Sequence, residues 1–129
     1  MEFDFTDQQM MIKNIAKEFA EQEIAKSAVD RDKNAEFPFE IIKKLGELGF
    51  LGMRVSPDYG GPGLDTISYV LALIEISKID ASVGVILSVN NSLVTFVLEK
   101  FANDYLKNKY LQKIADRKST RLNSSHGKL

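Results

Sequence analysis

The sequence contains no cysteine, and its 129 residues include a single histidine, His126. The absence of cysteine excludes disulfide bonds, thiolate nucleophiles and zinc–thiolate sites. Lysine and arginine together number 17 against 18 acidic residues, and the resulting net charge of -1 gives no electrostatic reason to bind nucleic acid or an anionic membrane. We therefore expect neither a metal site nor a nucleic-acid partner.

Strand-like alternation of apolar and polar residues is also missing, and apolar residues recur at helical spacing instead. We expect helices over residues 6–28, 38–49, 65–79, 81–101 and 103–115. Thr6 and Gln9 form a capping box at the first of these, and Gly49 caps the end of the second. Residues 30–36 are charged and lack a period, which predicts a loop. The fold class that follows is all-α, an antiparallel cluster of about five helices.

A turn-rich loop, residues 56–65 (SPDYGGPGLD), holds two of the three prolines and three of the eight glycines. No regular helix or strand accommodates such a run, and its prolines stiffen what the glycines leave loose, so the loop is expected to have a fixed shape. A phosphate-binding loop is not indicated, because no Lys-Ser or Lys-Thr pair follows the glycines.

The most apolar stretch is residues 81–101. Five polar residues interrupt it: Ser88, Asn90, Asn91, Ser92 and Thr95. A transmembrane span is therefore not favoured, and we expect a buried helix of a soluble fold.

On a helical wheel, residues 81–98 separate into two faces. One face carries Ile86, Val89, Asn90, Leu93 and Val97. The other carries Gly84, Ser88, Asn91, Ser92 and Thr95. The simpler interpretation makes the first face core and lets the second meet solvent or neighbours that satisfy its hydroxyl groups. The alternative makes the first face the wall of a slot for an alkyl chain, and composition does not separate the two.

Three polar side chains need the same weighing. Asn90 on the apolar face is expected to be an amide with satisfied hydrogen bonds. Glu75 lies on a narrow stripe with Ser68 and Ala72 and could act as an acid or base, but no second titratable group accompanies it, so a partnered Glu is favoured. Tyr59 is expected to pack against the glycine-rich turn. We predict no catalytic and no cofactor-binding residue in this chain.

Several short motifs, each weak alone, occur in an order and spacing that together form a resemblance. They are FTDQQ at 5–9, FAEQEI at 19–24, FP at 37–38, LGELG at 45–49, PDYGGPGLD at 57–65, EI at 75–76, NSL at 91–93 and KYL at 109–111. This set resembles the amino-terminal helical domain of the acyl-CoA dehydrogenases, from about residue 5 to about residue 115. The expected helices agree with the amino-terminal α domain of that family.

The resemblance implies the rest of the functional prediction. The parent protein would be an FAD-dependent acyl-CoA dehydrogenase that desaturates an acyl-CoA in fatty acid or amino acid breakdown or butyrate metabolism. Ile86, Val89, Asn90 and Leu93 would bind substrate as one wall of the acyl pocket, and the run SVGVILS at 82–88 is similar to the short-chain (butyryl-CoA) members. Electron-transfer flavoprotein would be the electron acceptor, and the oligomer a homotetramer. No secretory signal is visible, so the expected compartment is the cytoplasm, or the mitochondrial matrix in a eukaryote.

Residues 116–129 (DRKSTRLNSSHGKL) depart from the family pattern. Residues 116–126 of this stretch resemble the in-frame translation of a sequencing-library adapter. We expect a domain over residues 1–115 followed by a non-native, disordered tail. The catalytic Glu would then be absent and the fragment inactive alone. Two alternatives stay open: a self-contained helical module that binds a partner helix, and the same domain in an acyl-CoA oxidase.

Overall fold

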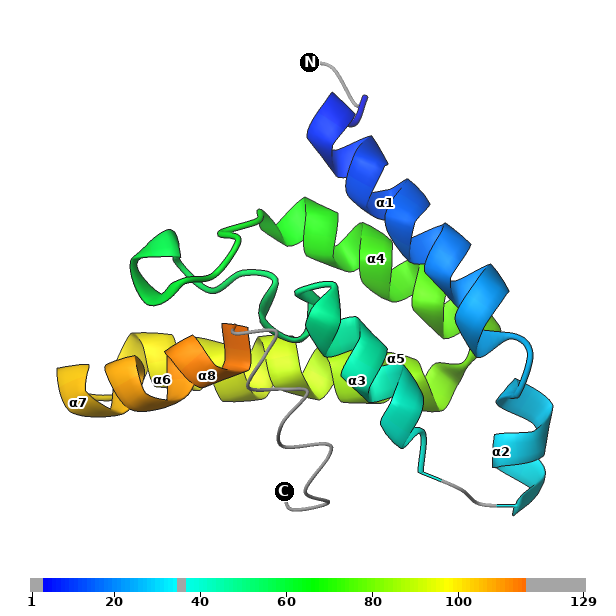
Figure 1. The fold of residues 1–129 in the computed structure, drawn as a ribbon. Coiled ribbons are helices and arrows are strands. Elements are labelled where there is room, and N and C mark those ends of the chain that lie inside the picture. The colour runs from blue at the N-terminus through cyan, green and yellow to red at the C-terminus, as the bar shows by residue number, and fades with distance from the viewer. Residues whose placement is uncertain (1–3, 35–36, 116–129) are drawn as a thin grey trace.

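The computed structural model describes residues 4–34 and 37–115, and within them the chain forms six continuous helices and no strand (Figure 1). The first helix is α1 (Asp7–Phe19), which continues into the π-helical η1 (Ala20–Ile24), and α2 (Ala28–Asn34) and α3 (Phe39–Glu47) follow it. The 3-10 turns η2 (Phe50–Gly52) and η3 (Pro57–Tyr59) come next and lead to α4 (Thr66–Ile79). The fifth helix is α5 (Ala81–Ser88) continuing through the π-helical η4 (Val89–Val94) into α6 (Thr95–Phe101), and the sixth is α7 (Asp104–Leu106) continuing through the π-helical η5 (Lys107–Leu111) into α8 (Gln112–Ala115). The all-α prediction is confirmed. The tail expected over residues 116–129 lies outside the described residues.

The helix ends lie where the capping residues predict them. The N–H of Gln9 donates to Thr6 Oγ1 over 3.1 Å, and the N–H of Thr6 donates to Gln9 Oε1 over 2.8 Å, which completes the capping box of α1. Asp65 Oδ1 accepts from the N–H of Ser68 at 2.7 Å and begins α4. Gly49, with a φ of 83°, follows α3 in the left-handed conformation that glycine adopts without strain.

The starts of α1 and α4 are tied to each other. Gln9 Nε2 donates to Asp65 Oδ2 over 2.9 Å, so the two helices begin side by side and run in the same general direction (Figure 1). The bonds from the N–H of Ser68 and the Gln9 amide hold the pKa of Asp65 below its usual value. By contrast, α4 and α5 are antiparallel, as expected, and the Tyr69 hydroxyl near the start of α4 reaches Ser92 in η4 at 3.0 Å.

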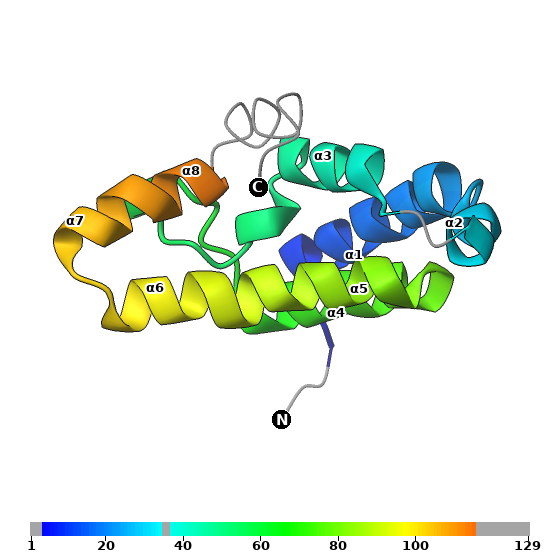
Figure 2. The same cartoon turned by 90° about the horizontal axis from the view of Figure 1, so that it is seen from below.

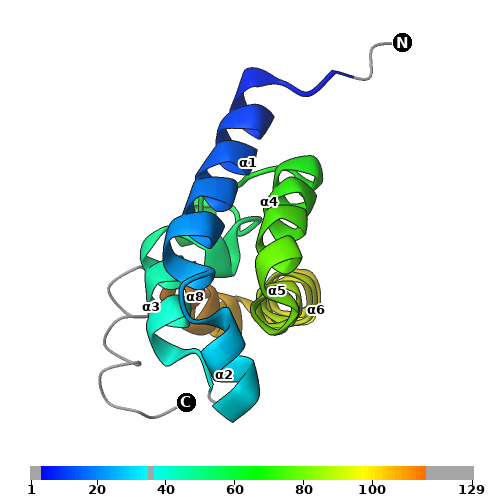
Figure 3. The same cartoon turned by 90° about the vertical axis from the view of Figure 1, so that its right-hand side faces the viewer.

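The helices pack around one buried cluster. Viewed along α5 and α6, α4 lies beside α5, and α1 lies along the other side of α4 (Figure 3). The helix formed by α7, η5 and α8 doubles back along α6, and its Leu111 is fully buried (Figure 2). The buried cluster draws its residues from α1, η1, α3, η2 and the adjoining Met53, α4 and α5, and comprises Ile12, Ala16, Ala20, Ile24, Ile41, Leu45, Phe50, Leu51, Met53, Tyr69, Ala72, Ile76, Val83 and Leu87.

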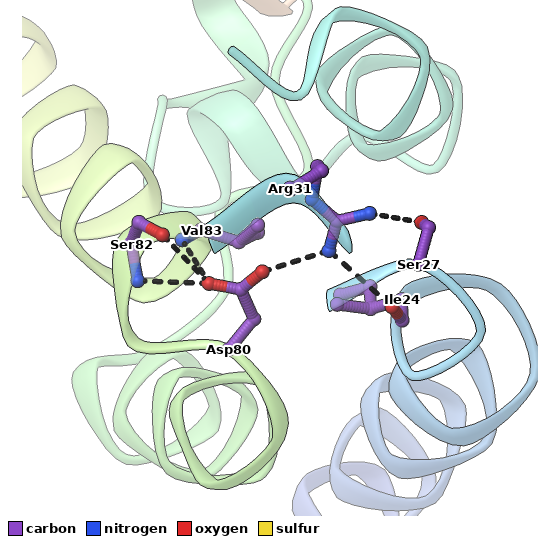
Figure 4. A network of polar contacts seen from close by, with 6 residues as sticks. All are labelled: Ile24, Ser27, Arg31, Asp80, Ser82 and Val83. Carbon is purple, nitrogen blue, oxygen red and sulfur yellow. Dashed lines mark hydrogen bonds and ion pairs between the residues drawn. The ribbon is translucent and has the colours of Figure 1, made fainter. Parts of the chain in front are cut away.

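The prediction of a loop over residues 30–36 is wrong for residues 30–34, because these residues belong to α2, which extends to Asn34. Arg31 of α2 is buried and bonds to three residues: its guanidinium donates to Asp80 Oδ2 at 2.7 Å, to the carbonyl of Ile24 at 3.3 Å and to the hydroxyl of Ser27 (Figure 4). Ser27 and Ile24 lie four and seven positions away, but Asp80, which supplies the counter-charge, lies 49 positions along the chain. A local periodicity test therefore could not detect the helix.

The stripe of α4 that contains its small and polar residues faces the interior. Ser68, Ala72 and Glu75 are buried, whereas Ile67, Val70 and Ile74 are exposed. The buried residues against which α4 packs include Ala16 of α1 and Ala20 of η1, so small side chains on both sides permit a close approach. The Ser68 hydroxyl is buried without a hydrogen-bond partner among the described residues.

The central loop has a fixed backbone path. The N–H groups of Leu64 and Gly63 donate to the carbonyls of Met53 and Val55, each at 2.9 Å, and this pairing folds the loop back on its own start. A Cβ at Gly61 would lie 2.2 Å from the Val55 carbonyl oxygen, so only glycine fits at this point.

The helix Ala81–Phe101 is long and apolar enough to cross a membrane by length and composition alone. One such helix is weak support for a membrane protein, because a core helix of a soluble protein passes the same test.

The ion pair of Arg31 and Asp80 generates a stability prediction. We expect Asp80→Asn to lower the free energy of unfolding at neutral pH by about 3 kcal/mol, because Asn still caps α5 but leaves the buried guanidinium without its counter-charge. Chemical denaturation of the purified variant measures this change. Glu23→Gln is the matched control, since it breaks the exposed Lys44–Glu23 pair and should change little.

The same pair predicts a pH dependence. Burial disfavours the Asp80 carboxylate, but hydrogen bonds from Arg31, Ser82 and the N–H of Val83 outweigh burial and hold the pKa of Asp80 below its usual value. The ion pair therefore makes its full contribution to the free energy of unfolding above the pKa of Asp80 in the unfolded chain, about 3.9. This contribution is lost as the pH falls through the lower pKa that Asp80 has in the folded protein. The difference between wild type and Asp80→Asn should shrink in acid. A difference that stays constant down to the acid transition would contradict the assignment.

Candidate functional site

The continuous helix of α5, η4 and α6 carries all four residues predicted to bind substrate. The residues of this helix that face the interior are Val83, Gly84, Leu87, Asn91 and Thr95, and all are buried. Val89 and Leu93 point the other way and keep 42% and 61% of their surface exposed. The polar Asn91 and Thr95 thus meet the core together with Val83, Gly84 and Leu87, whereas the apolar Val89 and Leu93 face outward.

This arrangement overturns the simpler interpretation of the wheel. The face of Val89, Leu93 and Val97 is not core, since each of these residues is exposed. The opposite face is the buried one, and at Gly84 the helix α5 approaches α4 too closely for any larger side chain. At Gly84, a Cβ would lie 2.1 Å from Ser77 Oγ.

A side-chain amide anchors the helix at its centre. Asn91, with no solvent exposure, accepts from the N–H of Met53 through Oδ1 at 2.8 Å, and its Nδ2 donates to the carbonyls of Phe50 and Leu87 at 2.9 and 3.0 Å. Thr95 is buried one turn later and donates its hydroxyl to the Asn91 carbonyl at 2.9 Å. The polar groups on this face are therefore satisfied inside the protein, and the segment around η2 is joined to η4.

The π-helical η4 keeps the inward residues in register. Val83, Leu87, Asn91 and Thr95 follow one another at intervals of four, and a stripe of this kind drifts around a regular α-helix, whose turn takes about 3.6 residues. A π-helical turn takes more residues, so η4 returns Asn91 and Thr95 toward the stripe of Val83 and Leu87. Such turns occur frequently at functional sites.

The four predicted residues share one side of the helix, because they are spaced three or four positions apart. Val89 and Leu93 are exposed, and Ile86 and Asn90 are half-buried. Asn90 Nδ2 lies 3.5 Å from the Leu51 carbonyl, at the limit of a hydrogen bond, so this amide is bound far more weakly than that of Asn91. The side is apolar except for one amide, and contact with a ligand stays a prediction.

The other polar candidates take structural positions. Glu75 is buried and accepts from Lys78 Nζ at 3.3 Å, so it is partnered, as predicted. Tyr59 is half-buried in η3. No group of three or more His, Cys, Asp or Glu side chains among residues 4–34 and 37–115 could hold a metal ion.

The sequence pattern places Asn91 among the polar residues of the helix but does not predict that its side chain anchors the helix. The available signal was an amide in an apolar helix at the same spacing as Leu87 and Thr95. Its partners, Phe50 and Met53, lie about forty positions away and could be identified only from the fold.

Comparison with known proteins identifies the family that this chain resembles. The model of the family described as acyl-CoA dehydrogenase, N-terminal domain, matches residues 6–118. An acyl-CoA dehydrogenase of Bacillus subtilis (strain 168) is 46% identical over 110 residues, which are 85% of this chain and 29% of that protein. The chain thus spans less than a third of the length of this relative.

Solved structures show the same fold. A structure described as the electron transferring flavoprotein of Acidaminococcus fermentans is similar with a TM-score of 0.87 and 41% identity, over 94% of this chain and 31% of that one. Butyryl-CoA dehydrogenase from Megasphaera elsdenii is similar with a TM-score of 0.84 and 32% identity, over 92% of this chain and 32% of that one.

The adjacent asparagines of η4 provide a direct test of the anchor. We expect Asn91→Ala to lower the free energy of unfolding by about 3 kcal/mol, because the buried N–H of Met53 and the carbonyl of Phe50 lose their partner. Asn90→Ala removes only the 3.5 Å contact and should cost less than about 1 kcal/mol. Denaturation of both variants under the same conditions makes the comparison. Equal losses would show that Asn91 is not the anchor.

Proposed function

Because the chain belongs to the acyl-CoA dehydrogenase family, of which it is the N-terminal domain, we propose that its parent protein is an FAD-dependent enzyme that introduces an α,β double bond into a short-chain acyl-CoA. The reaction would serve fatty acid or amino acid breakdown or butyrate metabolism. The likeness to butyryl-CoA dehydrogenase supports the short acyl chain.

The observation that carries this proposal is the outward apolar side of α5 and η4. A self-contained domain of this size has little reason to expose Val85 and Leu93 by 61% each on the same helix. The exposed side is backed by a rigid support, because the Asn91 anchor fixes η4 from behind. A rigid apolar wall is suited to an alkyl chain.

In this proposal Ile86, Val89, Asn90 and Leu93 bind and orient the acyl group. Their side chains remove water from the alkyl chain, and the distance to which Leu93 and Asn90 project limits its length. They do not move a proton, since none is titratable. Glu75 is engaged with Lys78 within α4, so the carboxylate that removes the α proton would come from another part of the parent enzyme.

We assign no residue of this chain to FAD. The outward side of α5 and η4 presents apolar groups and one amide, which fit an alkyl chain and not the phosphates of a dinucleotide. FAD, when bound, supplies the acceptor for the hydride.

Further properties of the parent enzyme follow from the same proposal. Electron-transfer flavoprotein is its electron acceptor, an assignment supported by the likeness to the Acidaminococcus fermentans structure. The enzyme is a homotetramer of the cytoplasm, or of the mitochondrial matrix in a eukaryote. Residues 1–115 form the domain and residues 116–129 are a non-native tail.

Of the alternatives, the helical interaction module is less well supported. A module that folds by itself should cover its apolar surface, whereas this domain leaves Val89, Leu93 and Val97 exposed. An acyl-CoA oxidase would use the same wall, and reaction of the reduced flavin with oxygen distinguishes it from a dehydrogenase.

The wall predicts a change in chain-length preference. The parent gene is recovered by sequencing the source DNA across the Ala115 codon, where the reading frame should continue in place of residues 116–129. In the parent enzyme, Leu93→Ala should raise kcat/KM for hexanoyl-CoA relative to butyryl-CoA by about tenfold, because the shorter side chain leaves room for additional methylene groups.

Ile74→Ala is the control for this substitution. Ile74 is an exposed apolar residue of the neighbouring α4 and is not part of the wall, so its truncation should leave the ratio unchanged. A genomic stop codon directly after Leu129, or equal ratios in Leu93→Ala and Ile74→Ala, would refute the proposed role.

A second prediction concerns the 129-residue chain alone. We expect it not to reduce added FAD in the presence of butyryl-CoA, because it lacks the proton-removing carboxylate. Flavin absorbance under anaerobic conditions records the reaction, and the parent enzyme is the positive control. Bleaching of the flavin by the isolated chain would contradict the assignment of the catalytic group to another part of the protein.

A further inference from the structure

Two arginines, Arg31 and Arg54, lie in the described part of the chain, and the protein treats them differently. Arg31 is buried and has a full set of internal partners: the carboxylate of Asp80, the carbonyl of Ile24 and the hydroxyl of Ser27. Arg54 is half-buried, yet it forms no ion pair and no side-chain hydrogen bond with any described residue. A half-buried guanidinium with no carboxylate partner in the described part of the chain is unusual.

The position of Arg54 is nevertheless well defined. The preceding residue, Met53, is held by the Asn91 anchor through its N–H. The guanidinium carbon lies 6.0 Å from the ring centre of Tyr69 in α4 and 5.8 Å from that of Phe96 in α6. Both distances are in the range of a cation–π interaction, which orients the cation but leaves its N–H groups free to donate.

Two hydroxyl groups accompany this cation. The Tyr69 hydroxyl and Ser92 Oγ are 3.0 Å apart and share one hydrogen bond. Two hydroxyl protons are available and one is used between them, so the pair can donate one further bond. Arg54, Tyr69 and Ser92 thus combine a positive charge with spare donors.

Two carboxylates on the elements next to Arg54 are engaged elsewhere. Asp65, at the end of the central loop, accepts from Gln9 and Ser68. Glu75 on α4 accepts from Lys78. The anion that would complement Arg54 is therefore not supplied by either of them.

We propose that Arg54, Tyr69 and Ser92 form a binding site for a small oxyanion, a carboxylate or phosphate group. The planar guanidinium donates two parallel hydrogen bonds to such a group, and its orientation by the two rings lowers the entropy lost on binding. Partial burial strengthens the electrostatic attraction. This site does not depend on the acyl-CoA proposal, because none of its residues belongs to the predicted alkyl wall.

The experiment follows the side-chain Nε–H signals of the arginines by NMR in the 129-residue chain, at a concentration where it is monodisperse. Sodium phosphate and sodium acetate are titrated separately, with sodium chloride at matched ionic strength as the reference. We expect a saturable shift of Arg54 with at least one of the two oxyanions and no such shift of Arg31. The anion with the tighter binding identifies the chemistry of the ligand. Changes no larger than those in sodium chloride for both anions would overturn the proposal.

Variants separate the site from general charge effects. Arg54→Gln should weaken binding at least tenfold, and Arg54→Lys should give an intermediate affinity, because it keeps the charge and loses the planar fork. Tyr69→Phe keeps the ring and removes a hydroxyl, and it should weaken binding by about threefold.

Lys109 provides the matched control, since it also lies over two aromatic rings, those of Tyr105 and Tyr110, at 5.7 and 5.4 Å. Lys109→Gln should leave binding unchanged. Circular dichroism checks that each variant is folded, and Arg54→Lys and Tyr69→Phe carry the test if Arg54→Gln is not. Wild-type affinity in the folded Arg54 variants would refute the site.

Discussion

The side chain of Asn91 makes three hydrogen bonds from a position without solvent exposure, and through them the long helix of α5, η4 and α6 is joined to the segment that links α3 to the central loop. Several features depend on this contact. It satisfies backbone groups at Phe50 and Met53 that have to turn within the core, and it fixes the starting point of the loop that folds back on Met53 and Val55. A buried amide is costly to leave unpaired, so this contact also determines which side of the helix faces inward.

The inward orientation of small and polar residues has a functional consequence. Close packing of α4 against α1 and α5 uses Ala16, Ala72 and Gly84, while Val85 of α5 and Val89 and Leu93 of η4 are left on the outside. In an isolated domain this surface would be a liability. In the proposed enzyme it is the acyl-binding wall, and the requirement for tight helix packing on one side is what frees the other side for a ligand.

The helix starts and stops, the loop and the family resemblance could be read from the chain itself. The capping contacts of Thr6 with Gln9, of Asp65 and of Gly49 join residues only a few positions apart, so the short sequence around each one is enough to predict a helix end. Burial was harder to predict. The helix of Arg31 depends on Asp80, 49 positions later, and the orientation of the 81–101 helix depends on the segment near residue 50. The α-helical wheel also could not include the π-helical turn that shifts the register of η4.

The amino-acid sequence by itself determined that this protein is helical, where most helices begin and end, and to which family it is similar, because capping and periodicity act over a few residues and motifs keep their order along the chain. Only the tertiary structure decided which face of each apolar helix is core and which is available to a ligand. When a helix is apolar on most of its circumference, hydrophobicity no longer distinguishes its faces. The choice then depends on close approach and buried hydrogen bonds, as at Gly84 and Asn91, and these depend on partners distant in the sequence.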